Sequence, residues 1–212
     1  MKINKLPNEI YSASVKFGLL KKNQPYKFKK ITDGVSSDIW YVKTMDKEYC
    51  IKRALKKLTV KEDWFAPIER NNFEANYFKY SKSIIPESFP KILGHDSKNY
   101  ILAMEWFDNS KYIVWKKKLL NKSISVKDGK RIGKLLGTVH KYYYNKKKFR
   151  KIFLNDKTFY DIRLEPYLVF TSKSYPELSN YYKGTINFLK KNKNTVIHGD
   201  FSPKNILLGK NY

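Results

Sequence analysis

The chain has 212 residues, of which 42% are hydrophobic and 16% aromatic, so it is long enough to bury a core and too apolar for a disordered tail. Its single cysteine, Cys50, excludes an internal disulfide, and three scattered histidines give no zinc-binding spacing. The sequence contains neither an N-terminal signal-like region nor an apolar run that could span a bilayer. We therefore expect a cytoplasmic protein with no membrane partner.

The net charge of +25 raises the question of nucleic-acid binding. Only five of the 44 basic residues are arginines, however, and the lysines are spread along the whole chain. Proteins that recognise bases and phosphates usually rely heavily on arginine. We expect no specific nucleic-acid partner, and a basic nucleic-acid-binding protein is the least favoured alternative. The tight lysine runs at 116–118 and 146–148 are interpreted as solvated surface.

The first half of the sequence alternates short strand-like runs with turns. Strands are predicted at 27–32, 39–44, 48–55, 91–94 and 100–106. In the third of these strands the period of two places Cys50 and Lys52 on one face. A helix is predicted at 68–81, with Phe73, Tyr77 and Tyr80 as its apolar stripe and Glu74 outside that stripe.

The second half is mostly helical. Helices are predicted at 126–144, 160–169 and 178–190, with a short strand at 195–197 and a second apolar segment at 206–208. The helix at 126–144 carries a broad apolar stripe made by Ile132, Leu135, Leu136, Val139 and Tyr143. The sequence thus predicts an α+β protein with a sheet-rich nucleotide-binding lobe at 1–106 and a partial helical lobe at 107–212, which ends just after the loop described next. A nucleotide would lie between the two lobes.

The segment 198–205 reads H-G-D-x-x-x-x-N. An aspartate followed five positions later by an asparagine has the spacing of the kinase catalytic loop. In that arrangement Asp200 would orient or deprotonate an acceptor hydroxyl, and the amide oxygen of Asn205 would bind Mg²⁺. His198 is predicted to orient the loop by hydrogen bonding.

Further candidates lie upstream in the order that a kinase requires. Lys52, on a strand, would neutralise nucleotide phosphates, and Glu74, on the following helix, would hold it in place. The turn at 33–37 could cover phosphates through its backbone and through the hydroxyl of Ser36 or Ser37, although it has one glycine and an ordinary hairpin turn is the alternative. Main-chain groups of Glu105 and Phe107 could bond an adenine edge.

Three other residues have simpler interpretations. Cys50 is predicted to be a small buried residue and not a reactive thiol. His140 lies on the apolar side of its helix and is interpreted as a core or supporting residue. For Arg163 two roles stay open, which are lining the acceptor pocket and helix packing.

Together these residues resemble the aminoglycoside phosphotransferase-like family, relatives of choline and methylthioribose kinases with the protein-kinase-like fold. The resemblance covers nearly the whole chain, and the segments that carry it are 34–40, 51–55, 63–67, 70–74, 102–105, 163–167 and 198–207. It implies ATP-dependent, Mg²⁺-assisted transfer of the γ-phosphate to a hydroxyl of a small molecule.

Two differences from related enzymes shape this interpretation. Gly199 and Ser202 stand where protein kinases carry Arg and Lys, which favours a small-molecule acceptor. The family also has an apolar-Asp-aromatic-Glu segment after the catalytic loop, whose aspartate binds the metal ions, and nothing after Leu208 supplies it. We therefore interpret the chain as C-terminally truncated, with a non-catalytic nucleotide or metabolite binder as the alternative. The sequence does not identify the acceptor.

Overall fold

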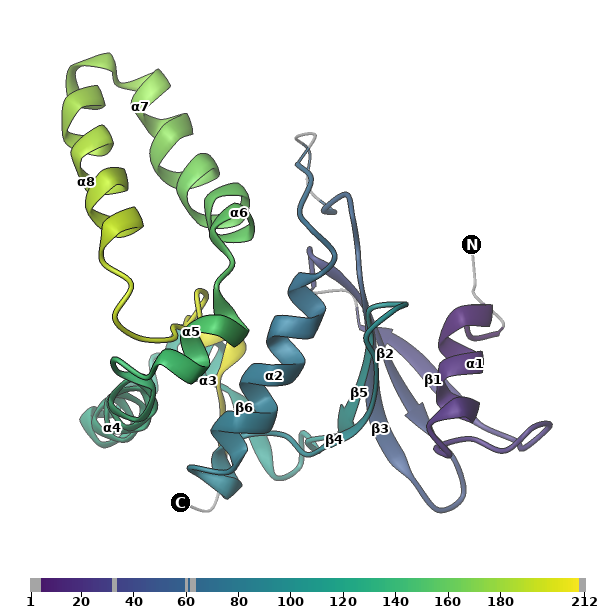
Figure 1. Cartoon of the computed structure of the whole chain (residues 1–212). Helices are drawn as coiled ribbons and strands as arrows, with labels where there is room; N and C mark the ends of the chain where they lie inside the picture. The colour runs from purple at the N-terminus through teal and green to yellow at the C-terminus, as the bar shows by residue number, and fades with distance from the viewer. Residues whose placement is uncertain (1–4, 32–33, 60, 62–63, 210–212) are drawn as a thin grey trace. The chain divides into compact units, whose positions relative to one another are not determined.

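The computed structural model (Figure 1) describes residues 5–31, 34–59, 61 and 64–209. Thr32, Asp33 and Asp63, which belong to predicted segments, lie outside the described residues. The chain divides into two compact units, Met1–Trp106 and Phe107–Tyr212, so the division falls at the residue where the sequence places it. The structure is mixed α and β, in agreement with the predicted α+β class.

Unit 1 is built on a five-stranded antiparallel sheet with the order β1-β2-β3-β5-β4. The central strand β3 pairs with β2 on one side and β5 on the other, and the register places Lys52 opposite Ile39 and Leu102. The pairing of β4 with β5 shifts between Ile92 and Gly94. The strand bounds are β1 Lys27–Ile31, β2 Ser37–Lys43, β3 Glu48–Ala54, β4 Ile92–Asp96 and β5 Ile101–Glu105.

One face of this sheet is covered by helix α1, Asn8–Lys16, which the sequence did not predict. Ile10 and Ala13 of this helix are buried in one cluster with Trp40, Tyr49 and Ile51 of the sheet. The helix has few apolar residues, NEIYSASVK, so its periodicity is weak and its burial depends on the sheet. Because Tyr49 and Ile51 face this core, the alternation along β3 leaves Cys50 and Lys52 on the opposite face.

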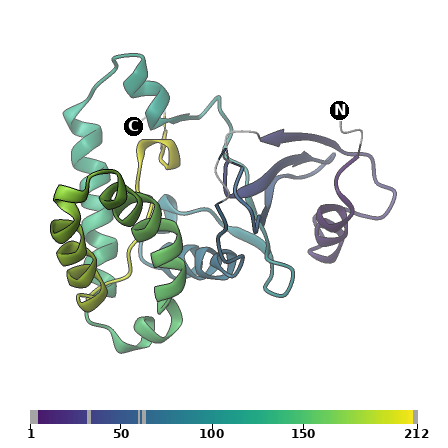
Figure 2. The ribbon, with the colours of Figure 1, turned by 90° about the horizontal axis from the view of Figure 1, so that it is seen from above.

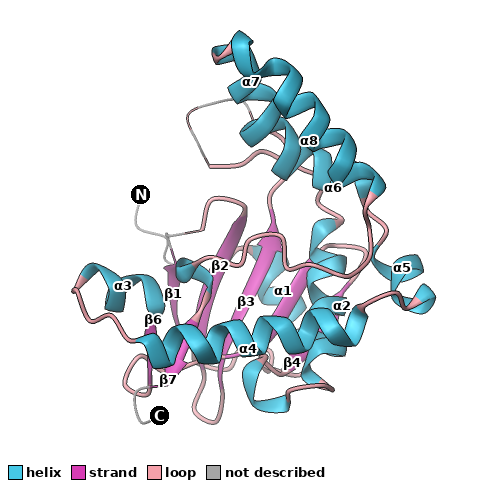
Figure 3. Ribbon diagram, turned by 90° about the vertical axis from the view of Figure 1, so that its left-hand side faces the viewer, coloured by secondary structure: helices cyan, strands magenta, loops and turns pink. Residues whose placement is uncertain are grey.

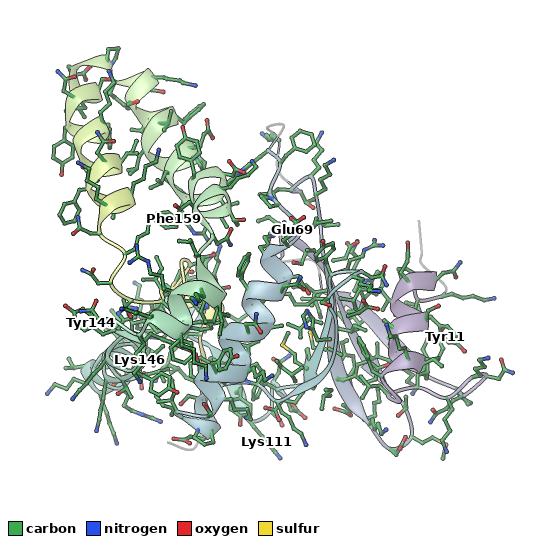
Figure 4. The ribbon with its side chains drawn as sticks, in the orientation of Figure 1. Tyr11, Glu69, Lys111, Tyr144, Lys146 and Phe159 are labelled. Carbon is green, nitrogen blue, oxygen red and sulfur yellow. The ribbon has the colours of Figure 1, made fainter. Side chains whose placement is uncertain are left out.

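The second helix of unit 1, α2, spans Arg70–Lys82 and contacts β3, β4 and β5. Figure 4 labels Glu69 where α2 begins and Tyr11 on α1, and the two helices lie on opposite sides of the sheet. Of the predicted apolar stripe Tyr77 is buried, but the other fully buried positions are Asn71, Ala75 and Ser81, which the stripe did not include. Small side chains dominate the contact, and the bulkier Phe73 and Tyr80 are half-buried. A short helix, η1 Pro86–Ser88, follows.

Unit 2 is helical apart from a two-stranded antiparallel sheet, β6 with β7. The predicted strand at 195–197 is wrong, because this segment has no strand partner and is attached instead by Thr195 Oγ1, which donates to the His140 carbonyl at 2.8 Å. No helix in the described part of the chain is long and apolar enough to cross a membrane. The elements are β6 Tyr112–Val114, α3 Trp115–Leu120, α4 Val126–Tyr143, α5 Lys147–Phe153, α6 Asp156–Phe159, η2 Tyr160–Val169, α7 Phe170–Ser174, η3 Pro176–Leu178, α8 Ser179–Lys191, η4 Pro203–Asn205 and β7 Leu207–Gly209.

The longest helix, α4, begins at Ser125, whose side chain accepts a hydrogen bond from Asp128 N. Its predicted stripe is confirmed, since Ile132, Val139 and Tyr143 are buried and Leu135 and Leu136 are half-buried. The buried carboxylate of Asp128 bonds Lys118 Nζ at 2.5 Å. The lysine run at 116–118 is therefore not uniformly solvated, contrary to the prediction.

The predicted helix at 160–169 is present as a π-helix, η2, with Pro166 inside it. Proline lacks an N–H and its ring clashes with the carbonyl four residues earlier in an α-helix. The wider π turn accommodates such a residue, and π turns are frequent near functional sites. Helices α7 and α8 then run side by side as a hairpin (Figure 3).

Candidate functional site

The Lys52 side chain lies on the face of β3 that α1 leaves uncovered. Its Nζ is 2.7 Å from the carboxylate oxygens of Glu74 on α2. The two side chains are 15% and 31% exposed, so the pair is partly shielded from solvent and still accessible. The structure thus brings together the two unit 1 residues that the sequence paired across twenty-two positions.

Arg70 connects α2 to the strands and loops around this pair. Its guanidinium donates to the carbonyl oxygens of Pro67 and Leu55 at 2.7 Å, of Ala66 at 3.1 Å, and of Ser36. Burial lowers the pKa of Arg70 from its ordinary value, while the nearby carboxylates of Glu74 and Glu69 act in the opposite direction. Arg70 therefore fixes the turn before β2 against the same helix that holds Glu74.

Residues 34–37 of the predicted phosphate-covering turn are described, whereas Asp33 is not. The Ser36 carbonyl accepts from Leu55 N at 3.1 Å as well as from Arg70, and the Val35 carbonyl accepts from Thr59 N at 2.8 Å. Ser37 is the first residue of β2 and is only 8% exposed, while Ser36 is exposed. Of the two predicted hydroxyls, that of Ser36 is the more accessible to a phosphate.

The predicted adenine-binding residues lie at the division between the units and belong one to each. Glu105 ends β5, its N–H donates to the Lys91 carbonyl at 3.0 Å, and its Oε1 accepts from Lys91 N at 2.7 Å. Phe107 begins unit 2, where its ring packs edge-on against Tyr112 with centroids 5.1 Å apart. The N–H of Glu105 is therefore used within unit 1.

Cys50 lies on the same face of β3 as Lys52. Burial raises the pKa of the Cys50 thiol to about 11, with a smaller lowering by Lys52 and a smaller raising by Glu74. The thiol is therefore protonated at neutral pH, which agrees with the prediction that Cys50 is not a reactive thiol. By solvent exposure the residue is half-buried, whereas the sequence predicted a fully buried one.

This burial has a measurable consequence, because Cys50 is the single cysteine of the chain. We expect the alkylation rate of the native protein by iodoacetamide to rise about tenfold per pH unit until pH approaches about 11. In denaturant the rate should level off near the ordinary thiol pKa of about 8.5. Mass spectrometry of the alkylated protein against pH measures both profiles, and native alkylation that saturates near pH 8 would contradict the raised pKa of Cys50.

The backbone of the predicted catalytic loop in unit 2 is held by hydrogen bonds within the loop. Ser202 N donates to the Asp200 carbonyl and Asn205 N donates to the Ser202 carbonyl, each at 2.9 Å. Asn205 Nδ2 also donates to the Asp200 carbonyl at 2.9 Å. This bond turns the amide nitrogen toward the loop, so Oδ1 is the atom of Asn205 that could reach a metal ion. Asp200 N donates to His198 Nδ1 at 3.2 Å, which agrees with the predicted orienting role of His198.

Cations surround the Asp200 carboxylate. Lys204 Nζ lies 3.2 Å and Arg163 Nη2 lies 3.8 Å from Oδ2, and Ser202 Oγ donates to Oδ1 at 3.2 Å. Burial alone would raise the pKa of Asp200, but Lys204, Arg163 and the Ser202 hydroxyl outweigh it and hold the pKa below its ordinary value. Asp200 is therefore an anion at neutral pH that can accept a hydrogen bond from a hydroxyl.

Gly199 allows the backbone to enter this loop. Its φ is +76°, a left-handed conformation that favours glycine. A Cβ at this position would lie 3.7 Å from Arg163 Nε, which is an ordinary contact. The left-handed backbone conformation, and not a steric limit, therefore accounts for glycine at position 199.

We expect Gly199→Ala to lower the stability of unit 2 by about 1–2 kcal/mol, the cost of a left-handed conformation for a residue with a Cβ. Urea unfolding followed by fluorescence measures this difference. Gly133→Ala is a suitable control, because a Cβ there meets nothing within 4 Å and alanine favours a helix. Equal destabilisation by both variants would contradict the backbone explanation.

Two residues near the candidate site were not identified from the sequence. Lys204 pairs with Asp200 four residues away, and the spacing from this aspartate to the asparagine assigns no role to the residues between them. Arg70 forms its bonds with carbonyl oxygens from three separate segments, which no local pattern encodes. For Arg163 the structure places the side chain beside the predicted catalytic loop. Its Nη1 donates to the Ile162 carbonyl at 2.9 Å, and its Nη2 lies 3.8 Å from Asp200 Oδ2.

The predicted metal site has fewer of its expected groups than the predicted phosphate-binding site at Lys52 and Glu74. Among the residues that the structure describes, no group of three or more His, Cys, Asp or Glu side chains is arranged to hold a metal ion. Asn205 Oδ1 fits as one oxygen ligand, and Mg²⁺ commonly takes further ligands from phosphates and water. Asp200 is nearby, but its oxygens are occupied by Lys204 and Ser202.

Comparisons with known proteins leave the family open. No protein-family model matches the sequence, and no curated protein matches it.

Proposed function

We propose that this protein binds ATP and transfers its γ-phosphate to a hydroxyl of a small molecule, as a small-molecule kinase with a protein-kinase-like two-lobed fold. Unit 1 would be the nucleotide-binding lobe and unit 2 the helical lobe that carries the catalytic loop. The similarity to the aminoglycoside phosphotransferase-like family is part of this proposal.

The observation that carries the proposal is the ion pair between Lys52 and Glu74, at 2.7 Å. In kinases a strand lysine contacts the nucleotide phosphates and a helix glutamate holds that lysine in position. Here the two residues come from β3 and α2, on a sheet face that α1 does not cover. Ion pairs on protein surfaces are common, but a lysine that is 15% exposed and fixed by a helix carboxylate is suited to bind phosphate.

The reaction assigns a separate task to each residue. Lys52 would neutralise charge on the phosphates, and Ser36 could donate to a phosphate oxygen. Asp200, held as an anion, would accept a hydrogen bond from the acceptor hydroxyl and orient its oxygen for in-line attack. Asn205 would hold Mg²⁺ through Oδ1, and the metal ion would neutralise charge on the transferred phosphate.

A non-catalytic nucleotide binder is the second candidate function. It is favoured by the single amide ligand at the metal site and by the lack of a carboxylate cluster among the described residues. A binder would keep the tasks of Lys52 and Glu74 and would give Asp200 no chemical role.

Two measurements on the chain test the proposal. Thermal unfolding with ATP, with and without Mg²⁺, measures binding, since a ligand that binds the folded state raises the midpoint. Transfer from γ-labelled ATP to water and to a panel of hydroxyl compounds measures catalysis. No stabilisation by ATP would refute both candidate functions, whereas stabilisation without transfer would favour the binder.

The role of Asp200 is tested by Asp200→Asn. We expect ATP to stabilise this variant as it does the wild type, while transfer falls by about 10²–10⁴-fold, the usual contribution of a positioned acid or base. Asp161→Asn is the matched control, because Asp161 also pairs with a lysine four residues away, at 2.7 Å, outside the catalytic loop. Undiminished transfer by the Asp200 variant would overturn the assignment.

A further inference from the structure

A pocket of about 480 Å³ lies beside Asp200, entirely within unit 2. It is an open depression on the surface and not an enclosed cavity, with a volume in the range of small-molecule sites. One side is the catalytic loop, with Asp200, Ser202, Pro203 and Lys204, and the other side is α3. Figure 2 shows the end of this loop, in yellow, beside the teal helix α3.

The position of α3 against the loop is fixed by the small sheet. Val114 of β6 pairs with Leu207 of β7, and the next residue, Trp115, donates its N–H to the Ile206 carbonyl at 2.9 Å. The helix that follows β6 is thereby held next to the segment that precedes β7. The two sides of the pocket form one structural unit.

The lining has two chemical characters. Leu119, Leu120 and Pro203 provide apolar surface, and Leu120 is 71% exposed, so this wall is accessible from solvent. The charged groups are two ammonium groups, from Lys116 and Lys204, against the one carboxylate of Asp200. Because Asp200 also has Arg163 at 3.8 Å, its charge is already balanced.

Unit 2 as a whole carries a net positive charge, as the lining of the pocket does. Unit 2 contains 24 of the 44 Lys and Arg residues of the chain but seven of its 19 Asp and Glu residues. Of these acidic residues, Asp128, Asp156 and Asp161 each form an ion pair with a lysine that does not line the pocket. A polyamine would find almost no uncompensated carboxylate near Asp200 and would be repelled by the surrounding charge.

We propose that this pocket binds an anionic hydroxyl compound, such as a sugar phosphate or a sugar acid, with its anionic group at Lys116 and its carbon skeleton against Leu119 and Leu120. A hydroxyl of the same molecule would then reach Asp200. This inference rests on the proposed function, because it names the acceptor class for that site. It excludes polycationic acceptors such as aminoglycosides, on the basis of charge.

Binding is measured without nucleotide, by calorimetric titration of the chain with ribose 5-phosphate, ribose, inorganic phosphate and kanamycin. We expect ribose 5-phosphate to bind at least about tenfold more tightly than each of the other three, the effect of one or two charge-assisted hydrogen bonds together with apolar contact. Equal or tighter binding of kanamycin would overturn the inference. Equal binding of inorganic phosphate would show an anion site that does not recognise the hydroxyl compound, and would overturn it as well.

Variants of α3 locate the site. Lys116→Gln should weaken ribose 5-phosphate binding about five- to tenfold. Lys117→Gln removes the same charge from the adjacent residue, which does not line the pocket, and should leave the affinity within about twofold. Equal weakening by both variants would attribute binding to diffuse charge and contradict the pocket.

The experiments distinguish failure of the proposed acceptor class from failure of the proposed kinase function. Ribose 5-phosphate binding that depends on Lys116, in a protein that ATP does not stabilise, would keep the pocket and refute the kinase. ATP-dependent transfer to ribose or kanamycin, but not to ribose 5-phosphate, would keep the kinase and refute the acceptor class.

Discussion

Lys52→Met should remove most of the stabilisation that ATP gives to the chain. The substitution keeps the length of the side chain but removes the ammonium group that would contact the phosphates, and it leaves Glu74 without its partner. A lost charge-assisted contact of about 1.5–3 kcal/mol corresponds to a fall in affinity of roughly ten- to 150-fold. Thermal unfolding over a range of ATP concentrations measures the change.

Lys43→Met is the matched control for this prediction. Lys43 lies on β2 of the same sheet and forms an ion pair with Glu48 on β3, but both residues are at the other end of the strand pairing from Ser37 and Ala54. Its loss should leave ATP binding unchanged. If the two variants lose the same affinity, the effect is one of general charge and the phosphate-binding role of Lys52 is wrong.

Arg70→Met should lower the free energy of unfolding of unit 1 by about 2–4 kcal/mol, one of the larger effects available to a single substitution in this chain. The methionine cannot donate to the carbonyl oxygens of Ser36, Leu55, Ala66 and Pro67 that the guanidinium bonds. Arg70→Lys should recover only part of the loss, because one ammonium group cannot replace the planar fork of donors. Urea unfolding measures both variants.

The comparison for this prediction is Arg53→Met on β3. Arg53 bonds the carboxylates of Asp38 and Glu9, at 3.1 and 3.2 Å, and is 30% exposed. Glu9 is 62% exposed, and Asp38, although partly buried, keeps Lys30 as a second cationic partner at 2.9 Å. Substitution of Arg53 therefore leaves no buried charge unpaired and should cost clearly less. If Arg53→Met destabilises the protein as much as Arg70→Met does, the carbonyl contacts of Arg70 are not the reason for its effect.

The sequence predicted those parts of the site whose residues form local patterns. The alternation along β3 placed Lys52 opposite the core residues Tyr49 and Ile51, and this needs only the period of a strand. The pairing of Lys52 with Glu74 followed from their order, and the loop from Asp200 to Asn205 followed from its spacing.

The features that were missed depend on long-range contacts. Helix α1 is stabilised by the sheet that it covers, and strand β6 exists only because β7 pairs with it. The apolar periodicity of α2 did not predict Asn71, Ala75 and Ser81 as buried, because these side chains are small or polar. They are buried because α2 packs against the sheet on that side. In each case the partner, and not the local periodicity, determines the structure.

The pairing of β6 with β7 joins a segment near the start of unit 2 to a segment near its end, which directly follows the predicted catalytic loop in the sequence. Contacts between segments so far apart in sequence form only after much of the chain between them has been restricted, because closing a long loop costs entropy before the contact returns any free energy. We therefore expect Asp200 and Asn205 to take up their final geometry late in the folding of unit 2. A helical hairpin such as α7 with α8 can form early and locally, whereas the proposed site at Asp200 depends on contacts between segments far apart in sequence.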